Sequence, residues 1–388
     1  MRIVADEDIL SVDKSFSKFG ELIKIPGRKI ARQDLLNADA LLVRSITRVD
    51  GQLLDQSGVK FVGSATAGTD HVDLDYLKCN NIEFSNASGC NANAVVEYCL
   101  TALAITGVRQ SIDFSRSSFG IIGAGNVGSL LAEKLANLGY QCLVCDPFIT
   151  ERRRLRLEQL NCPLVGFDEA LTANVISLHV PLTFTGDHPT IHLLNETNLT
   201  SLAPNAVLLN TSRGAVVDNH DLLKVLSKRN DLHAVVDVWE DEPNINRELL
   251  TRVRLGSPHI AGYSIEAKRS ATARLCRNFC EFFALPVQQE GQEPSLVSED
   301  FIELDKVATD DMDSLCLKLL SRVLPLTDIT RQLRQQMSLS NNNPAQIFDK
   351  LRKQLVSRHE FCAYRVDARL FGPRQKLLLA TMGFNLKQ

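Results

Sequence analysis

The sequence predicts an α/β protein with two Rossmann-like, doubly wound domains, the first of them discontinuous, followed by a small α/β C-terminal module. Two observations support this prediction. Short apolar runs alternate with segments of helical periodicity along residues 1–288, which is typical of parallel sheets covered by helices. A glycine-rich motif at residues 123–128 also lies between a predicted strand and a predicted helix, as in a dinucleotide-binding domain.

Length and composition set the outer limits. The chain has 388 residues, enough for two or three domains, and 44% of them are hydrophobic, enough for sizeable cores. A formal net charge of -3 gives no general attraction to nucleic acid or to membranes. The sequence shows no apolar run long enough to span a bilayer and no signal peptide. We therefore expect a cytoplasmic protein that binds neither nucleic acid nor membranes.

The cysteine pattern favours buried thiols over redox or metal chemistry. The chain has ten cysteines, which fits a reducing compartment. Cys142 and Cys145 have C-x-x-C spacing, but they lie inside a predicted strand, where two buried thiols are more common than a redox pair. No second cysteine or histidine cluster at ligand spacing accompanies them, so we expect no metal.

The glycine-rich motif predicts an NAD site. It follows an apolar strand at residues 119–122, precedes a helix at 129–138, and reads Gly123, Ala124, Gly125, Asn126, Val127, Gly128. The glycines make the turn tight and let a pyrophosphate approach the backbone, while the helix N-terminus favours its charge. The next strand, residues 141–145, ends at Asp146, which is placed to accept hydrogen bonds from the adenosine ribose. Its charge would repel a 2′-phosphate, so NAD is favoured over NADP.

Three polar residues follow apolar runs in the same domain. Arg213 comes after residues 206–210, Glu242 after residues 234–238, and His259 after a short strand-like stretch that directly precedes it. Reacting groups collect at the carboxyl ends of strands in open parallel sheets. An arginine can hold a carboxylate with two hydrogen bonds, and a histidine paired with a carboxylate can accept a proton near neutral pH. This set suits the oxidation of a 2-hydroxy acid.

Each of these assignments has a competitor. Glu240 and Asp241 compete with Glu242 as the partner of the histidine, but only Glu242 is followed by a proline that would fix the turn. His71 is the rival of His259 as the catalytic histidine, but a histidine in this position is expected to brace a loop. His179 is expected to line the NAD cleft. Arg44, at a strand end, is either a solvated charge or part of a phosphate site.

The chain divides into three predicted parts. The substrate-binding domain comprises residues 1–92 and 256–288, with strands at 3–5, 40–44 and 60–63 and a returning helix at 265–283. Residues 93–255 form the NAD-binding domain, which begins with a helix at 93–106. After a polar linker at 288–294, residues 289–388 form the C-terminal module. We expect helices there at 310–324 and 343–355, a strand at 361–366, a turn at Gly372 and Pro373, and a β-rich stretch that ends at residues 377–379.

These features resemble the D-isomer-specific 2-hydroxyacid dehydrogenase family over residues 1–290. The likeness rests on LVRSIT at 42–47, FVGSATAGTDHVD at 61–73, GCNA at 89–92, RGAVVDN at 213–219 and PHIAGY at 258–263. The resemblance implies catalytic roles for Arg213, Glu242 and His259, with Asp237 near the nicotinamide amide. It implies NAD contacts at Asp146, Val180, Thr211, Ser212, Arg213, Asp237 and Gly262. It implies substrate contacts at Ser45, Thr66 and Tyr263, and a C-terminal module that makes a homodimer.

The substrate that the resemblance implies is a small phosphorylated 2-hydroxy acid, 4-phospho-D-erythronate, oxidised in vitamin B6 synthesis. The pair Thr211 and Ser212 replaces an expected Ala-Cys pair, a modest departure. Three alternatives stay open: another 2-hydroxy acid, such as 3-phosphoglycerate or an unphosphorylated acid, a NAD-binding regulatory protein, and a formate dehydrogenase. The Arg-Glu-His set disfavours the regulator, since binding alone needs no proton acceptor, and Glu242 disfavours formate oxidation.

Overall fold

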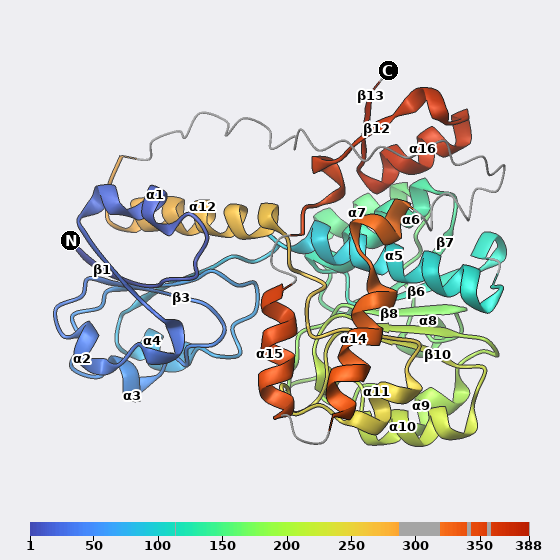
Figure 1. Ribbon diagram of the computed structural model, residues 1–388, viewed down its shortest axis with the longest axis horizontal. Helices are drawn as coiled ribbons and strands as arrows, with labels where there is room; N and C mark the ends of the chain where they lie inside the picture. The colour runs from blue at the N-terminus through green and yellow to red at the C-terminus, as the bar shows by residue number, and fades with distance from the viewer. Residues whose placement is uncertain (113, 287–318, 340–342, 355–357, 388) are drawn as a thin grey trace. The chain divides into compact units, whose positions relative to one another are not determined.

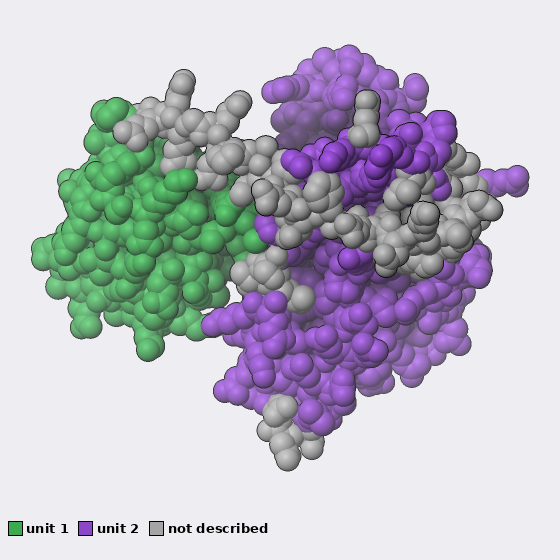
Figure 2. Space-filling model, turned by 45° about the horizontal axis from the view of Figure 1, so that its top comes forward, with its two compact units in different colours: residues 1–91, 264–296 green, residues 92–263, 297–388 purple. Residues whose placement is uncertain are grey.

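The structure is a computed structural model that describes residues 1–388 except 113, 287–318, 340–342, 355–357 and 388. It divides into two compact units, shown in green and purple in Figure 2. Unit 1 comprises Met1–Asn91 with Ser264–Leu296, and unit 2 comprises Ala92–Tyr263 with Val297–Gln388. The predicted linker at 288–294 and most of the predicted helix at 310–324 lie outside the described residues.

Unit 1 is built on a parallel five-stranded sheet. The strand order is β2-β1-β3-β4-β5, which is a doubly wound arrangement. The strands are β1 (Arg2–Asp6), β2 (Glu21–Ile25), β3 (Ala40–Val43), β4 (Phe61–Ser64) and β5 (Glu83–Asn86). The central strands β3 and β4 are buried on both faces, so their sequences are continuous apolar runs that were simple to predict. The outer strands β2 and β5 are half-exposed, and the sequence analysis missed both.

Helices cover both faces of this sheet. They are α1 (Val12–Phe16), α2 (Arg32–Leu35), α3 (Gly51–Leu54), α4 (Leu74–Cys79) and the returning helix α12 (Ile265–Phe282). The side chain of Ser264 caps α12 by accepting a hydrogen bond from the Ala267 N–H at 2.9 Å. Phe279 of α12 packs edge-on against Phe16 and Phe61, with ring centroids 5.4 and 5.6 Å away. The returning helix is therefore part of the core of unit 1.

Unit 2 contains a parallel six-stranded sheet of order β11-β10-β9-β8-β6-β7. Its strands β6, β7, β8 and β10 are labelled in Figure 1. The strands are β6 (Ser118–Ile122), β7 (Gln141–Cys145), β8 (Val175–Leu178), β9 (Val207–Asn210), β10 (His233–Val236) and β11 (Leu255–Gly256). The chain runs from β6 outward to β7 and then crosses to β8 on the other side. Ligands of such sheets bind at this reversal, beyond the carboxyl ends of the strands. The predicted α/β class and Rossmann-like organisation are confirmed.

The flanking helices of unit 2 are α5 (Ala92–Gln110), α6 (Asn126–Asn137), α7 (Glu151–Gln159), α8 (Phe167–Ala170), α9 (Glu196–Ser201), α10 (Asn219–Lys228) and α11 (Arg247–Arg252). Short 3-10 turns occur in both units, at η1 (Ser17–Phe19), η2 (Gly27–Lys29), η3 (Phe114–Arg116), η4 (Gly214–Val216), η5 (Phe361–Ala363) and η6 (Ala368–Leu370).

Unit 2 continues through Tyr263, beyond the predicted end of the NAD-binding domain at residue 255. The strand β11 pairs with β10 and so belongs to the sheet of unit 2. Among the described helices, none is both long enough and apolar enough to cross a membrane.

The C-terminal module differs in detail from the prediction. It contains α14 (Leu326–Ser338), α15 (Pro344–Gln354), β12 (Arg365–Asp367), α16 (Pro373–Met382) and β13 (Asn385–Lys387). The predicted β-rich stretch ending at residues 377–379 is wrong, because those leucines lie in α16. Gly372 caps that helix and Pro373 occupies its first turn, which a proline tolerates since the N–H there has no helical partner. The predicted strand at 361–366 is a 3-10 turn followed by the short β12.

The module packs onto unit 2 within the same chain. Leu333 of α14 and Phe348 and Leu351 of α15 are buried in one cluster with Trp239 and Leu249. Polar contacts reinforce this packing, since the Gly256 N–H donates to Thr330 Oγ1 at 3.1 Å and Arg334 donates to the carbonyls of Leu250 and Val253. The apolar faces of α14 and α15 are therefore covered by their own chain.

Candidate active site

A histidine and a carboxylate meet beyond the carboxyl ends of β10 and β11. His259 Nδ1 lies 2.7 Å from Glu242 Oε2. A carboxylate oxygen can only accept, so the Nδ1–H donates, and in the neutral imidazole the lone pair is then on Nε2. The other oxygen of Glu242 accepts the Trp239 N–H at 2.8 Å, which fixes the carboxylate. Sequence reasoning had paired these two residues, and the structure brings them together.

The electrostatics keep Glu242 ionised. Burial alone would raise the pKa of its carboxyl group, but the charge and hydrogen bond of His259, the Trp239 N–H and the charge of Arg352 outweigh burial. The net effect is a pKa below the usual value of 4.5. The dyad therefore holds a carboxylate beside the imidazole at neutral pH, which is the arrangement that orients a histidine as a proton acceptor.

Asp237 anchors the loop that carries His259. Its side chain is buried and accepts hydrogen bonds from Ser257 Oγ at 2.6 Å and from the N–H groups of Ile260 and Ala261 at 2.8 and 2.9 Å. The Tyr98 hydroxyl also contacts Ser257 Oγ at 2.6 Å. His259 itself has a left-handed backbone with φ of 55°, a conformation that the surrounding bonds must hold. The sequence analysis gave no role to Tyr98 or Ser257, because neither stands in a recognisable motif.

The loop of Arg213 lies directly against the loop of Glu242. A Cβ atom on Gly214 would come within 2.0 Å of the Trp239 backbone, so only glycine fits beside Arg213. The Arg213 carbonyl accepts from Asn210 Nδ2 at 2.9 Å, and its guanidinium donates to the Ser212 carbonyl at 2.8 Å. The end of β9 therefore places an arginine next to the turn that holds the dyad.

The glycine-rich loop has the shape of a pyrophosphate cradle. Gly123 has a φ of +91°, and a Cβ there would lie 2.7 Å from the His179 carbonyl. A Cβ on Gly128 would lie 1.9 Å from the Gly123 carbonyl, so this glycine allows the helix to pack closely. At Gly125 no described atom lies within 4 Å of the Cβ position, which leaves room above the backbone. Asn126 and Val127 then begin α6, whose N-terminus suits an anion.

Asp146 closes this loop from β7. Its Oδ2 accepts the Ala124 N–H at 2.7 Å, and its Oδ1 accepts the Phe148 N–H at 2.9 Å. A carboxylate has about four acceptor positions, so ribose hydroxyls still have places to donate. Arg153 of α7 donates to Asn126 Oδ1 at 2.6 Å.

Other predicted cofactor residues lie at the same edge of unit 2. Val180 follows β8, Thr211 and Ser212 follow β9, and Gly262 lies in the loop after His259. His179 Nε2 contacts Ser177 Oγ at 2.8 Å, and burial lowers the pKa of His179 to about 3. A histidine with that pKa stays neutral, which suits a lining residue better than a proton acceptor.

Three of the predicted substrate residues, Arg44, Ser45 and Thr66, lie in unit 1. Thr66 Oγ1 contacts Ser64 Oγ at 2.8 Å, and His71 Nε2 contacts the same hydroxyl at 2.9 Å, so His71 braces this loop. Arg44 forms two hydrogen bonds with Asp6, at 2.8 and 3.1 Å, and one with Asp8 at 2.6 Å. A phosphate at Arg44 would compete with two carboxylates, while Ser45, just beyond, is exposed. Contact of either residue with substrate stays a prediction.

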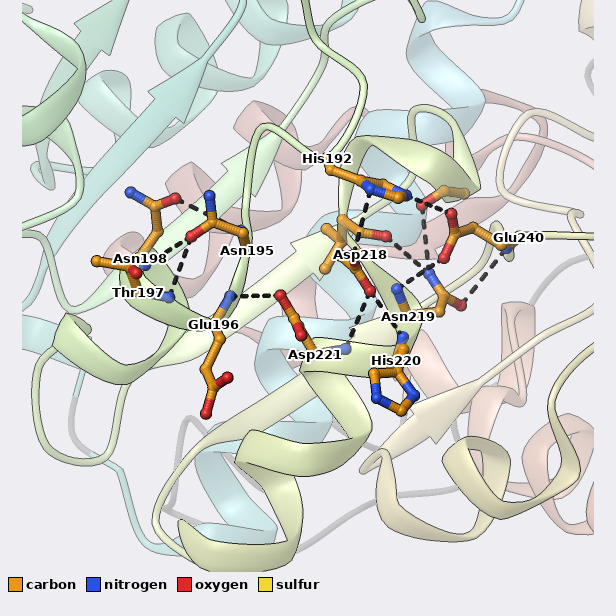
Figure 3. Close-up of polar contacts among 12 residues, drawn as sticks. His192, Asn195, Glu196, Thr197, Asn198, Asp218, Asn219, His220, Asp221 and Glu240 are labelled. Carbon is orange, nitrogen blue, oxygen red and sulfur yellow. Dashed lines mark hydrogen bonds and ion pairs between the residues drawn. The ribbon is translucent and has the colours of Figure 1, made fainter.

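A second histidine cluster lies on the loops beside α10, and Figure 3 shows it. His192 Nε2 lies 2.6 Å from Glu240 Oε1, and its Nδ1 lies 3.2 Å from Asp218 Oδ2. Each carboxylate faces a different ring nitrogen, which describes an ion-paired imidazolium better than three ligands aimed at one metal. The hydrogen bond to Glu240, with smaller help from both charges, raises the pKa of His192. Glu240 is thus engaged by a different histidine from the one Glu242 contacts.

The C-x-x-C cysteines point into different cores. Cys142 belongs to the same apolar cluster as Phe119, whereas Cys145 packs against the cluster that contains Leu178. Both are free thiols. Burial raises the pKa of Cys145, which disfavours the reactive thiolate.

The loop of His259 also receives two arginines that the sequence analysis did not single out. Arg352 of α15 donates to the Tyr263 hydroxyl at 2.6 Å, and Arg358 donates to the Ala261 carbonyl at 3.3 Å. Arg358 is paired with buried Glu97 of α5 at 2.7 Å, and burial raises the pKa of Glu97 to about 8. These contacts join residues far apart in the chain, so no spacing in the sequence could signal them.

Comparisons with known proteins agree with this geometry. Residues 105–261 match the family model described as D-isomer specific 2-hydroxyacid dehydrogenase, NAD binding domain. The erythronate-4-phosphate dehydrogenase of Azotobacter vinelandii is 40% identical over 390 residues, covering 99% of each chain. That of Cellvibrio japonicus is 39% identical over 387 residues, again covering 99% of each. The solved 3-phosphoglycerate dehydrogenase of Entamoeba histolytica, with NAD bound, has a TM-score of 0.60 and 26% identity over 73% of this chain and 95% of that one.

Proposed function

Because the chain belongs to the erythronate-4-phosphate dehydrogenases of the D-isomer-specific 2-hydroxyacid dehydrogenase family, we propose that it oxidises the C2 hydroxyl of 4-phospho-D-erythronate with NAD. The product is 2-oxo-3-hydroxy-4-phosphobutanoate, in a step toward pyridoxal 5′-phosphate. Near-full-length similarity supports this substrate over 3-phosphoglycerate, since the aligned relatives include the C-terminal module.

The observation that carries the proposal is the 2.7 Å bond between His259 and Glu242. Because Nδ1 donates to the carboxylate, Nε2 is the basic atom, and it accepts the proton of the C2 hydroxyl. Glu242 then stabilises the imidazolium that forms. Proton transfer of this kind is typically worth about 10²–10⁴-fold in rate.

The remaining roles follow from charge and position. Arg213 binds the substrate carboxylate and its 2-oxygen, because a guanidinium offers parallel donors that match both. NAD, when bound, supplies the acceptor for the two electrons that leave C2. Gly125 and the start of α6 would hold its pyrophosphate, and Asp146 would hold its adenosine ribose. Further NAD contacts would come from Val180, Thr211, Ser212, Asp237 and Gly262, with Asp237 near the nicotinamide amide.

An assay with purified protein tests this function. Protein, NAD and either 4-phospho-D-erythronate, 3-phosphoglycerate or D-erythronate are combined, and NADH formation is followed with and without an added 2-oxo acid. We expect the highest kcat/KM with 4-phospho-D-erythronate. Because the 2-oxo acid would oxidise NADH, the oxidised substrate is quantified as well. Faster formation of that product with no NADH released into solution would show that the cofactor is reoxidised without leaving. A higher kcat/KM for 3-phosphoglycerate would overturn the assignment, and NAD binding without turnover would favour the regulatory alternative.

The proposal includes a cytoplasmic homodimer. The two-fold dimer is the commonest assembly of soluble enzymes. Ile347 and Leu351 of α15 are buried in unit 2 of the same chain, so they are not available to a second copy. Leu377 on α16 is 60% exposed, so this helix offers an apolar contact for a second copy.

A further inference from the structure

The module that follows the dehydrogenase units brings a cation to the active-site loop. Arg352 lies in the last turn of α15, and its Nη2–H donates to the Tyr263 hydroxyl at 2.6 Å. The guanidinium carbon lies 5.3 Å from the centre of the Tyr263 ring and 5.9 Å from that of Phe348. Phe348 is fully buried and anchors α15 in the core. The position of Arg352 is therefore set by packing.

Tyr263 links Arg352 to the dyad. The Tyr263 N–H donates to the Ile260 carbonyl at 2.8 Å, one turn beyond His259, and the Ile260 N–H is held by Asp237. The charge of Arg352 also reaches Glu242, where it helps to lower the carboxyl pKa. Arg352 thus lies within electrostatic range of the reacting group.

The guanidinium retains binding capacity. Among the described residues, the hydrogen-bond acceptor of Arg352 is the Tyr263 hydroxyl, and the guanidinium forms no ion pair with a carboxylate. Arg44, by contrast, is already bound by Asp6 and Asp8. The Nη donors of Arg352 therefore face no competing carboxylate, and an anionic ligand can bind to them.

We infer that Arg352 binds the terminal phosphate of the substrate, with the Tyr263 hydroxyl beside it. This inference rests on the proposed function, in which Arg213 takes the carboxylate at the other end of the molecule. The substrate carries one carboxylate and one phosphate, so a second arginine at the site matches the second anion. The C-terminal module then determines specificity for a phosphorylated acid, in addition to its packing role.

The experiment compares kcat/KM for 4-phospho-D-erythronate and for D-erythronate in wild type and in Arg352→Gln. We expect roughly 10- to 100-fold loss with the phosphorylated acid, the size typical of a charged hydrogen bond, and little change with D-erythronate. Equal losses with both acids would show that Arg352 only braces Tyr263, and would overturn the inference. Unchanged discrimination would also overturn it.

Two further variants keep the test decisive. Lys353→Gln removes an exposed cation from the same helix turn, and its discrimination should match that of wild type. A loss of discrimination in this variant would place the phosphate elsewhere and count against Arg352. If Arg352→Gln does not fold, Arg352→Lys keeps the charge without the planar fork and should show an intermediate loss. Failure of wild type to oxidise 4-phospho-D-erythronate at all would instead refute the proposed function.

Discussion

Glu242 binds His259 through one carboxylate oxygen, at 2.7 Å, and the Trp239 N–H through the other, at 2.8 Å. Both oxygens are therefore committed, and the carboxylate cannot turn without losing a bond. A histidine held by such a group keeps one tautomer and one orientation, and the predictions about catalysis follow from this geometry.

Replacing His259 tests the proton acceptor. His259→Gln should lower kcat by about 10²–10⁴-fold, because glutamine cannot accept the hydroxyl proton, while the affinity for NAD changes little. Steady-state kinetics and calorimetric titration with NAD measure the two quantities. His71→Gln is the matched control, since His71 braces Ser64, and its kcat should fall far less. Near wild-type turnover in His259→Gln would refute the mechanism.

Glu242→Gln should change the pH dependence of both activity and stability. The pKa of Glu242 is lowered in the folded protein, so its charge stabilises the fold above the ordinary pKa of 4.5. That contribution is lost as the pH falls through the lowered value. The difference in Tm between wild type and variant should be full at neutral pH and shrink on acidification, and the kcat/KM profile should shift. Parallel pH curves would show that Glu242 does not tune the histidine.

Asp146 should govern the choice between NAD and NADP. Asp146→Asn keeps an oxygen that can accept the Ala124 N–H but removes the charge that repels a 2′-phosphate. The preference for NAD should fall by roughly tenfold, equivalent to about 1.4 kcal/mol. Asp146→Ala should weaken NAD more, because it also frees the glycine-rich loop. An unchanged ratio of kcat/KM values in Asp146→Asn would assign the ribose to another residue.

His192 should stabilise the fold only while it is protonated. Its pKa is raised, chiefly by the hydrogen bond to Glu240, so its contribution is full below about 6.5 and disappears as the pH rises through the raised value. The loss of Tm in His192→Gln should therefore be larger at about pH 6 than at about pH 9. The control is His220→Gln, a nearby exposed histidine on α10. A pH-independent loss would rule out the ion pair as its cause.

The homodimer is testable by light scattering on the full chain. Wild type should have twice the monomer mass of 43.0 kDa, and Leu377→Glu should dissociate, because a charge replaces an exposed apolar contact. Leu155→Glu, on the exposed surface of α7, is the matched control and should remain dimeric. Truncation before the module is a poor test, since it would uncover the core around Phe348. A monomeric wild type would refute the dimer.

The sequence predicted best those features that depend on strand ends. In a parallel sheet the carboxyl ends of neighbouring strands share one edge, so Glu242 and His259 could be paired although 17 residues separate them. The glycine-rich loop could be predicted equally well, because a side chain on Gly123 or Gly128 would clash with the backbone close by. Edge strands such as β2 were missed, since a half-exposed strand lacks the continuous apolar run of β3.

Contacts across the chain could not be predicted. Arg352 and Tyr263 are 89 residues apart and belong to no common periodicity, so only the packing of α15 brings them together. The local structure of the C-terminal module was also predicted incorrectly at one point, where a helix replaces the expected turn. Gly372 and Pro373 are as common in turns as at helix starts, and tertiary packing decided for the helix.

The packing of the C-terminal module also constrains how this protein is synthesised. Phe361 and Phe384 belong to the same core cluster as Phe119, Leu131 and Val207, and their stacked rings are 4.5 Å apart. A ribosome delivers the N-terminal residues first, so part of the interior of the nucleotide-binding unit stays uncovered until residues 361–384 emerge. Removal of residues 361–384 would leave that interior open to solvent.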